Sequence, residues 1–283
     1  MFNTSWPVLL VDDEPDVLTL SRLIMQDFTV YGLPLELHTV AGKADAISLM
    51  ETELIPYLPS IPPPRVAVAF IDVVMESDKA GLELCDYIRN TMGNKVVQLF
   101  IRTGQPGVAP ERQVIDNYDI NGYFTKAEAT EDKLYSLVKS GVRQYASYMA
   151  ATVSQALLAR MSMAAGSRDS LRSFMQMLPM FQREGHFLFI DGEAIGGTLA
   201  EERARSLAER LDRQTGLSLD GGDDKFVVDE EQNMLMKVAG DDRKAEVLHV
   251  IAGDWKFLPP ETVKAFLHGV MAAGAVLWKQ TAR

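Results

Sequence analysis

The sequence contains very little cysteine and fewer basic than acidic residues. Cys85 is the only cysteine among 283 residues, so neither an internal disulfide nor a cysteine-rich zinc site can form. The net charge of −11 argues against a nucleic-acid-binding surface, which needs clustered lysine and arginine. The most apolar late segment, 263–278, is interrupted by Lys264 and His268 and is too short to span a bilayer, and the N-terminus lacks the pattern of a signal peptide. We therefore expect a cytoplasmic protein that binds neither nucleic acid nor membrane.

The first half of the chain alternates short apolar runs with segments in which apolar residues recur at helical spacing. We expect strands at residues 8–11, 35–40, 66–74, 96–104 and 122–126. We expect helices after Pro15 and over residues 44–54, 81–92 and 111–118. The apolar residues of the first helix are Val17, Leu20, Leu23, Ile24 and Phe28. Strands that alternate with helices predict an α/β fold, in which a doubly wound, five-stranded parallel sheet is covered by helices on both faces.

Polar side chains stand at the carboxyl ends of these predicted strands. They are Asp12 and Asp13 after the first strand, Asp72 on the third, Thr103 on the fourth and Lys126 on the fifth. Because ligands bind beyond the carboxyl ends of the strands in such sheets, we expect these groups to converge on one edge. Carboxylate oxygens suit Mg²⁺, and a carboxylate beside bound Mg²⁺ can accept a phosphoryl group. Taken alone, Asp12 and Asp13 could also simply cap the following helix.

Four motifs at these strand ends, "VDDE", "FIDVVM", "IRTG" and "GYFTK", occur in the order found in the receiver domains of bacterial two-component response regulators. The sequence resembles that family over about residues 6–145. The motifs "RTGQPGVAPE" and "KAEAT" resemble those of one branch of this receiver family. Members of that branch precede a GAF-like segment and often an HD-GYP cyclic-di-GMP phosphodiesterase. The resemblance implies a flavodoxin-like receiver domain, for which we set the bounds 1–130. It also implies a signalling switch that is phosphorylated by a sensor histidine kinase or a phosphotransfer protein.

The resemblance also implies a role for each acidic residue. Asp72 would accept the phosphoryl group. Asp13 and Asp72 would ligate Mg²⁺ together with the backbone carbonyl of Val74, and Asp12 would act mostly through water. A merely solvated aspartate would be out of place inside the apolar strand "AFIDVV", so the functional interpretation of Asp72 is favoured over a surface role.

A purely structural explanation is also possible for the other three motif residues, Thr103, Lys126 and Tyr123. The resemblance implies that Thr103 and Lys126 bind the phosphoryl oxygens and that Tyr123 is the aromatic that changes rotamer. Threonine is also common at strand ends, lysine is mostly solvated, and a tyrosine here could simply pack in the core. The sequence departs from the family after Lys126, where Ala127 stands in place of the usual proline, so we expect no cis peptide bond there.

A long helix is expected from Thr130 to Met163, because this stretch has no proline and a single glycine. Its residues at alternating spacings of three and four are mostly apolar, a heptad pattern sustained over four repeats. We therefore predict a connecting and dimerising helix over 131–165 and a homodimer. The predicted dimer seam consists of Val142, Tyr145, Met149 and Ala156. The alternative is a helix that packs on its own domain.

Residues 166–283 predict a small α+β domain that loosely resembles a GAF-like domain and carries no ligand motif. We expect strands at 186–191, 226–228, 234–240 and 245–253, and helices at 171–181, 199–214 and 260–279. The expected role of this domain is dimerisation, binding of a downstream protein, or sensing of a small molecule. We expect no enzymatic activity beyond the receiver's own phosphorylation and dephosphorylation.

Two alternatives to a response regulator remain open. "GGDDKF" at 221–226 resembles the GGDEF signature of diguanylate cyclases, although the further acidic ligands of such an enzyme are not convincingly present and the same letters are typical of a polar turn. The sequence contains neither a His-Asp dipeptide nor GYP, which disfavours HD-GYP phosphodiesterase activity. The second alternative is a scaffold whose receiver docks without being phosphorylated, and the complete acidic set argues against it.

Overall fold

The chain divides into two units, Asn3–Met149 and Ala150–Arg283. The structure, a computed structural model, describes residues 5–54, 65–104, 111–176, 185–214, 217–218, 224–253 and 260–281. Within those ranges no helix has both the length and the apolar character that crossing a bilayer would require.

The N-terminal unit is built on a parallel sheet, as the alternating pattern predicts. Its parallel strands, in spatial order, are β3 (Leu33–Val40), β1 (Trp6–Val11), β4 (Val68–Asp72), β5 (Gln98–Thr103) and β6 (Gly122–Thr125). The prediction of five strands needs one correction, because a sixth strand, β2 (Thr29–Val30), pairs antiparallel with β3 at the edge. Tyr31 and Gly32 both have positive φ and form the tight turn that links these two strands. A two-residue strand has too little alternation for the sequence pattern to reveal it.

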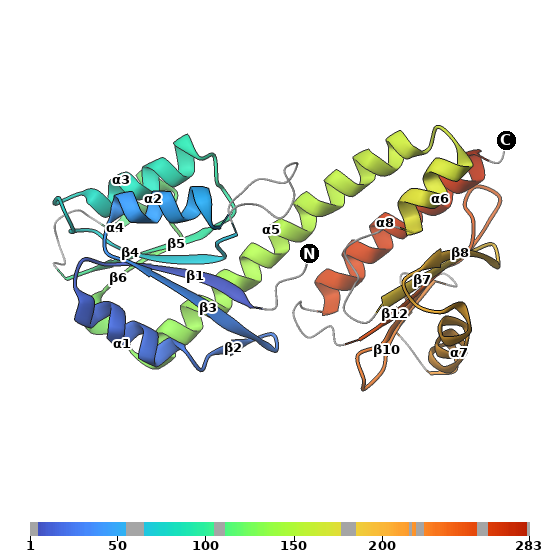
Figure 1. The fold of residues 1–283 in the computed structure, drawn as a ribbon, viewed down its shortest axis with the longest axis horizontal. Coiled ribbons are helices and arrows are strands. Elements are labelled where there is room, and N and C mark those ends of the chain that lie inside the picture. Colours follow the sequence, from blue (N-terminus) through green and yellow to red (C-terminus); the bar gives the residue numbers. More distant parts are fainter. Residues whose placement is uncertain are drawn as a thin grey trace. The chain divides into compact units, whose positions relative to one another are not determined.

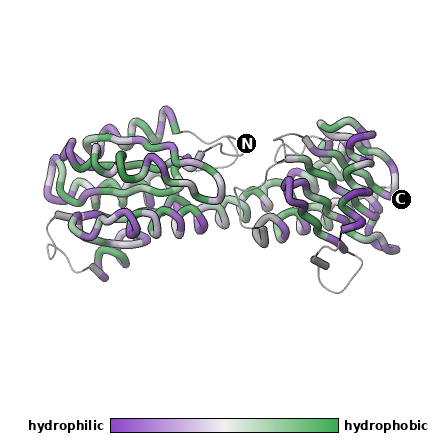
Figure 2. Tube along the Cα trace, turned by 90° about the horizontal axis from the view of Figure 1, so that it is seen from below, coloured by the Kyte–Doolittle hydropathy of each residue, from purple (hydrophilic) through white to green (hydrophobic). Residues whose placement is uncertain are grey.

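Helices cover both faces of this sheet (Figure 1). The helices are α1 (Pro15–Met25), α2 (Lys43–Thr52), α3 (Ala80–Asp86, continued by a π-helical turn over Tyr87–Thr91), α4 (Glu111–Tyr118) and α5 (Glu131–Ala164). Helices α2, α3 and α4 lie on one face, where Ala46, Leu84 and Val114 join the core of strand residues, and α1 and α5 lie on the other. In Figure 2 hydrophobic stretches run through the interior of each unit and hydrophilic stretches lie at its periphery.

The first part of α5 packs on its own sheet rather than presenting a free apolar face. Val142 is 0% exposed and Tyr145 is 5% exposed within the single chain. A Cβ on Gly141 would lie 2.8 Å from Val68, which shows how closely the helix approaches the strands. The predicted dimer seam is therefore wrong at Val142 and Tyr145: the same apolar stripe that gave the heptad pattern covers the sheet. The homodimer itself stays a prediction.

The C-terminal unit contains an antiparallel sheet of six strands among the described residues. In spatial order they are β8 (Glu193–Gly197), β7 (Gly185–Ile190), β12 (Val247–Ala252), β11 (Met234–Val238), β10 (Lys225–Val228) and β9 (Leu217–Ser218). Helix α7 (Glu201–Asp212) packs on one face, and α6 (Arg168–Gln176) and α8 (Pro260–Thr281) lie on the other (Figure 1). A small antiparallel α+β unit is thus confirmed, and its GAF-like identity stays a prediction.

A buried pair of histidines lies in this second sheet. His186 on β7 and His249 on β12 are both 0% exposed, and Nε2 of His249 lies 3.4 Å from Nδ1 of His186. Burial lowers the pKa of both imidazoles, and the neighbouring His186 lowers the pKa of His249 further. Both rings are therefore neutral in the folded protein near neutral pH.

We expect this pair to make the C-terminal unit unstable in acid. Below the ordinary histidine pKa of about 6.5 the unfolded chain binds protons that the folded chain excludes, so the free energy of unfolding should fall by up to about 1.4 kcal/mol per histidine for each pH unit. Urea unfolding followed between pH 7.5 and 5 measures this slope. The His186→Gln/His249→Gln double variant should flatten it. A slope that persists in the double variant would contradict the assignment.

Candidate functional site

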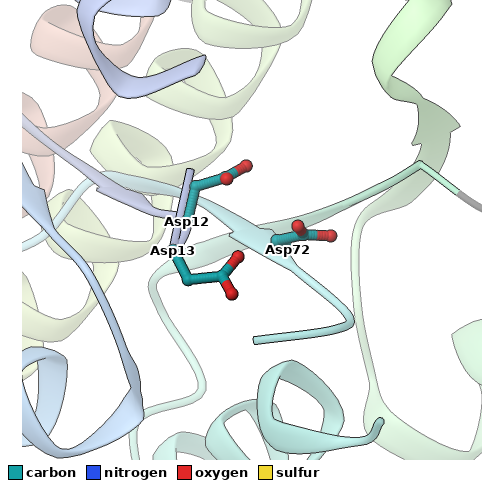
Figure 3. Close-up of side chains that lie close together, drawn as sticks. All are labelled: Asp12, Asp13 and Asp72. Carbon is teal, nitrogen blue, oxygen red and sulfur yellow. The ribbon is translucent and has the colours of Figure 1, made fainter. Parts of the chain in front are cut away.

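Three aspartates meet at the carboxyl edge of the parallel sheet (Figure 3). Asp12 and Asp13 directly follow β1, and Asp72 is the last residue of the adjacent strand β4. Each offers a carboxylate oxygen, and these atoms all lie within 4.8 Å of one another. Asp12 and Asp72 are buried and Asp13 is exposed. The structure thus brings together the three carboxylates that the sequence places at this edge.

The local backbone holds two of these carboxylates in place. Asp12 Oδ1 accepts the N–H of Glu14 at 3.0 Å, which turns the chain from β1 into α1, and Pro15 begins that helix. Asp72 Oδ1 accepts the N–H of the next residue, Val73, at 2.7 Å. In Figure 3 the carboxylates of Asp12 and Asp13 leave the end of β1 on different sides. Asp12 and Asp13 therefore meet different neighbours although they are adjacent in the sequence.

Lys126 lies among the carboxylates. Its Nζ is 2.6 Å from Asp72 Oδ2, 3.1 Å from Asp12 Oδ2 and 2.5 Å from Glu14 Oε1. Burial alone would lower the pKa of this ammonium, but its hydrogen bonds to the three carboxylates raise the pKa above its ordinary value. Lys126 opens a 3₁₀ turn, Lys126–Glu128, in which Thr125 and Glu128 form a capping box. The ammonium is thus fixed and charged at the edge where a phosphoryl oxygen would need a partner.

The other predicted residues lie at or near the same edge. Thr103 is the last residue of β5, is 1% exposed and pairs with Thr125 of β6. Tyr123 lies on β6 and packs, half-buried, against the core beneath α3 and α4, which fits the core-packing alternative as well as a switch. Val74 follows Asp72 by two residues in the loop after β4. The functional roles of these three residues stay predictions.

Two residues of this site were not assigned a role from the sequence. Arg102, on β5, is 2% exposed; its Nη2 donates to Asp12 Oδ2 at 2.9 Å and its Nη1 to Ser21 Oγ at 2.7 Å. Glu14 pairs with Lys126, and this hydrogen bond lowers the pKa of the glutamate. The sequence does indicate a role for Arg102, because a charged side chain within the apolar strand "VVQLFIRTG" needs a buried polar partner.

The charges around this edge suit a divalent cation. Four carboxylates (Asp12, Asp13, Glu14 and Asp72) face two cations (Lys126 and Arg102), which leaves two negative charges over. Burial raises the pKa of Asp72, and the nearby charge of Asp12 raises it further against the lowering effect of Lys126. The three aspartates offer hard carboxylate oxygens, the ligands that hard divalent cations prefer. The residues present therefore fit a hard divalent metal ion.

The strand order and the acidic edge characterise the N-terminal unit. The five parallel strands, numbered along the chain, lie in the order 2-1-3-4-5, which is the flavodoxin-like arrangement. Asp12, Asp13 and Asp72 lie at the carboxyl ends of the two adjacent central strands, with Lys126 bound to Asp72. The N-terminal unit therefore has the flavodoxin-like fold with an acidic site at its carboxyl edge. A carboxylate cluster of this kind can hold a metal ion.

Comparison with known proteins gives related results. No family model matches the chain. The chain is 40% identical over 140 residues to the 3'3'-cGAMP-specific phosphodiesterase 2 of Vibrio cholerae, a match that covers 50% of this chain and 25% of that protein. The match therefore spans about a quarter of the length of this relative.

Solved receiver structures also match. The signal receiver domain of an HD-domain-containing protein from Pseudomonas fluorescens Pf-5 has a TM-score of 0.40 and 17% identity, covering 50% of this chain and 98% of that one. The receiver domain of the Francisella response regulator 1452 has a TM-score of 0.38 and 17% identity, covering 49% of this chain and 95% of that one.

Proposed function

We propose that the chain is a response regulator whose receiver is phosphorylated on Asp72 with Mg²⁺ in the acidic site. The observation that carries this proposal is the ion pair between Asp72 and Lys126 at the strand edge, beside Asp13. A structural role alone does not account for buried carboxylates gathered where their mutual repulsion is costly. The proposed phosphodonor is a sensor histidine kinase or a phosphotransfer protein.

The proposed chemistry uses the groups of the site directly. An oxygen of Asp72 attacks the phosphorus of a phosphohistidine, a P–O bond forms, and the P–N bond breaks as its electron pair returns to the imidazole. Lys126, already 2.6 Å from Asp72, pairs with a phosphoryl oxygen, and Thr103 donates its hydroxyl to another. Bound Mg²⁺ would neutralise the charge that gathers on the phosphoryl oxygens. Uptake of phosphate from acetyl phosphate that requires Mg²⁺ and stops with a chelator tests the proposal, and absence of uptake would contradict it.

Mg²⁺ is expected to stabilise the receiver. The cation binds the folded site and relieves the repulsion between the carboxylates, so at a concentration one hundred times its Kd it should add about 2.7 kcal/mol to the free energy of unfolding. Thermal unfolding with and without excess MgCl₂ measures the effect. Asp13→Asn should remove most of the shift, whereas Asp116→Asn, an exposed aspartate on α4, should leave it intact. An unchanged melting temperature in the wild-type protein would contradict the metal site.

The proposed output runs through α5. This helix begins three residues after the Lys126–Glu128 turn and contributes residues to both units. We propose that phosphorylation, by drawing Lys126 and Thr103 toward the phosphoryl group, changes the packing of α5 in a homodimer or against a downstream protein. The seam would then use residues of α5 that the single chain leaves accessible, such as Met149 and Ala156.

A regulatory role is favoured over cyclase activity by the surroundings of Asp224. Residues 221–223 of "GGDDKF" lie outside the described part of the chain. Asp224 accepts the N–H of Ala239 at 2.6 Å, and its carboxylate also contacts His268 and Lys244, so this carboxylate holds the local fold together. The similarity to a 3'3'-cGAMP phosphodiesterase supports a link to cyclic-dinucleotide signalling. We propose that the chain regulates such signalling without making the nucleotide. Formation of a cyclic dinucleotide from GTP and Mg²⁺ by the purified chain would contradict this.

A further inference from the structure

Arg102 joins the acidic site to helix α1 from beneath the sheet edge. It alternates along β5 with Ile101 and Thr103, and it therefore projects to the face that carries α1. Its two terminal nitrogens reach Asp12 at 2.9 Å and Ser21 at 2.7 Å. Ser21 is buried on α1 and donates its hydroxyl to the carbonyl of Val17. The guanidinium is thus held at a fixed place below Asp12.

The carboxylate of Asp12 is already surrounded by donors. Oδ1 accepts the N–H of Glu14 at 3.0 Å and lies 3.2 Å from Lys126 Nζ. Oδ2 lies 2.9 Å from Arg102 Nη2 and 3.1 Å from Lys126 Nζ. A carboxylate offers about four acceptor sites, and these four contacts use them. Asp12, which is 0% exposed, is therefore satisfied without a metal ion, whereas Asp13 is exposed at the same edge.

We infer that Arg102 is a positioning residue that removes Asp12 from the metal ligands and thereby weakens binding of the divalent cation. The inference rests on the proposed function, because it assumes that the site binds Mg²⁺. With Asp12 bound to Arg102, Asp13 and Asp72 would hold the cation, and the guanidinium offsets the negative charge of Asp12. The planar fork of arginine suits this position because it reaches Asp12 and Ser21 at once.

The test is the Mg²⁺ affinity of the full chain, measured by calorimetric titration in the absence of a phosphodonor. Arg102→Met removes the guanidinium charge that offsets Asp12 next to the site and should tighten Mg²⁺ binding by about tenfold. Arg102→Lys keeps the positive charge and should stay within about threefold of the wild type. The Asp12→Asn/Arg102→Met double variant removes both charges and should also stay within about threefold. Unchanged or weaker binding by Arg102→Met would overturn the inference, as would an Arg102→Lys variant that binds as tightly as Arg102→Met.

The other outcomes are also decisive. If Arg102→Met does not fold, the double variant decides, since about tenfold weaker binding there would show that Asp12 is a ligand and would overturn the inference. Wild-type affinity in the double variant supports it. A wild-type protein that binds no Mg²⁺ would overturn the proposed function itself. A wild type that binds Mg²⁺ together with an unchanged Arg102→Met variant would overturn only the role of Arg102.

Discussion

Asp72→Asn is expected to abolish phosphoryl uptake by the chain. Asparagine has nearly the same shape as aspartate, and its amide oxygen can still accept the N–H of Val73, so the loop after β4 should keep its conformation. The amide is not a nucleophile that can form an acyl phosphate. The variant also lacks the buried charge of Asp72, whose burial raises the pKa of this carboxyl group in the wild-type protein. The expected result is a folded protein that no longer reacts.

The measurement is intact-mass spectrometry after incubation with acetyl phosphate and Mg²⁺. The wild-type chain should gain one phosphoryl group, and Asp72→Asn should gain none. Asp78→Asn is the matched control, because Asp78 is exposed and lies in the loop that follows β4. This control should react like the wild type. Uptake that persists in Asp72→Asn would place the acceptor on another residue.

The position of the acidic site could be predicted from the sequence because parallel strands bring their carboxyl ends to one edge. Asp12 and Asp72 are 60 positions apart, yet Val11 and Ile71 are register partners in adjacent strands, so their next residues meet. Lys126 follows from the same argument applied to β6. The strand order does not determine the side on which each carboxylate leaves the strand end, and hence it does not predict the pairing of Asp12 with Arg102.

The buried face of α1 was harder to predict. Leu20 and Leu23, which gave the helical periodicity, are 58% and 62% exposed, while Ser21 is buried. The periodicity correctly predicted a helix, but hydrophobicity alone places leucine rather than serine toward the sheet. The buried guanidinium of Arg102 needs a polar partner on α1, and Ser21 supplies it. A long-range hydrogen bond of this kind leaves no local pattern in the sequence.

The other differences between the predicted and the observed fold have two causes. Some edge strands are short, and the apolar stripe of a helix can have either of two partners. The strand β8 follows a turn in which Asp191 and Gly192 both have positive φ, like the turn before β3 in the first unit. Such hairpins depend on turn geometry more than on alternation. In α5 the heptad pattern reports an apolar stripe, and the pattern does not say whether its partner is a second copy or the chain's own sheet. Burial of Val142 in the N-terminal unit answers that question for the first part of the helix.

Gly81, near the start of α3, is the residue that lets this helix approach the end of β4. A Cβ at this position would lie 1.8 Å from the carbonyl oxygen of Asp72 and 2.8 Å from its carbonyl carbon. The N–H of Gly81 donates to the carbonyl of Val73 at 3.1 Å, so helix and loop are tied together at the point of contact. Neither the helix nor the strand can yield easily, since Ile71 and Leu84 are fully buried on either side.

Gly81→Ala is therefore expected to lower the free energy of unfolding by about 3 kcal/mol or more, because the methyl group meets backbone rather than a flexible side chain. The displaced atoms belong to Asp72 itself, so Mg²⁺-dependent stabilisation and phosphoryl uptake should fall together with stability. Urea unfolding, with acetyl phosphate uptake measured on the folded fraction, checks both effects. Gly269→Ala on α8 is the control: its Cβ would meet no atom within 4 Å, and the change should raise stability by about 0.5–1 kcal/mol. A Gly81→Ala protein that unfolds at the wild-type midpoint and takes up phosphate normally would show that the edge of the sheet does not depend on this close approach.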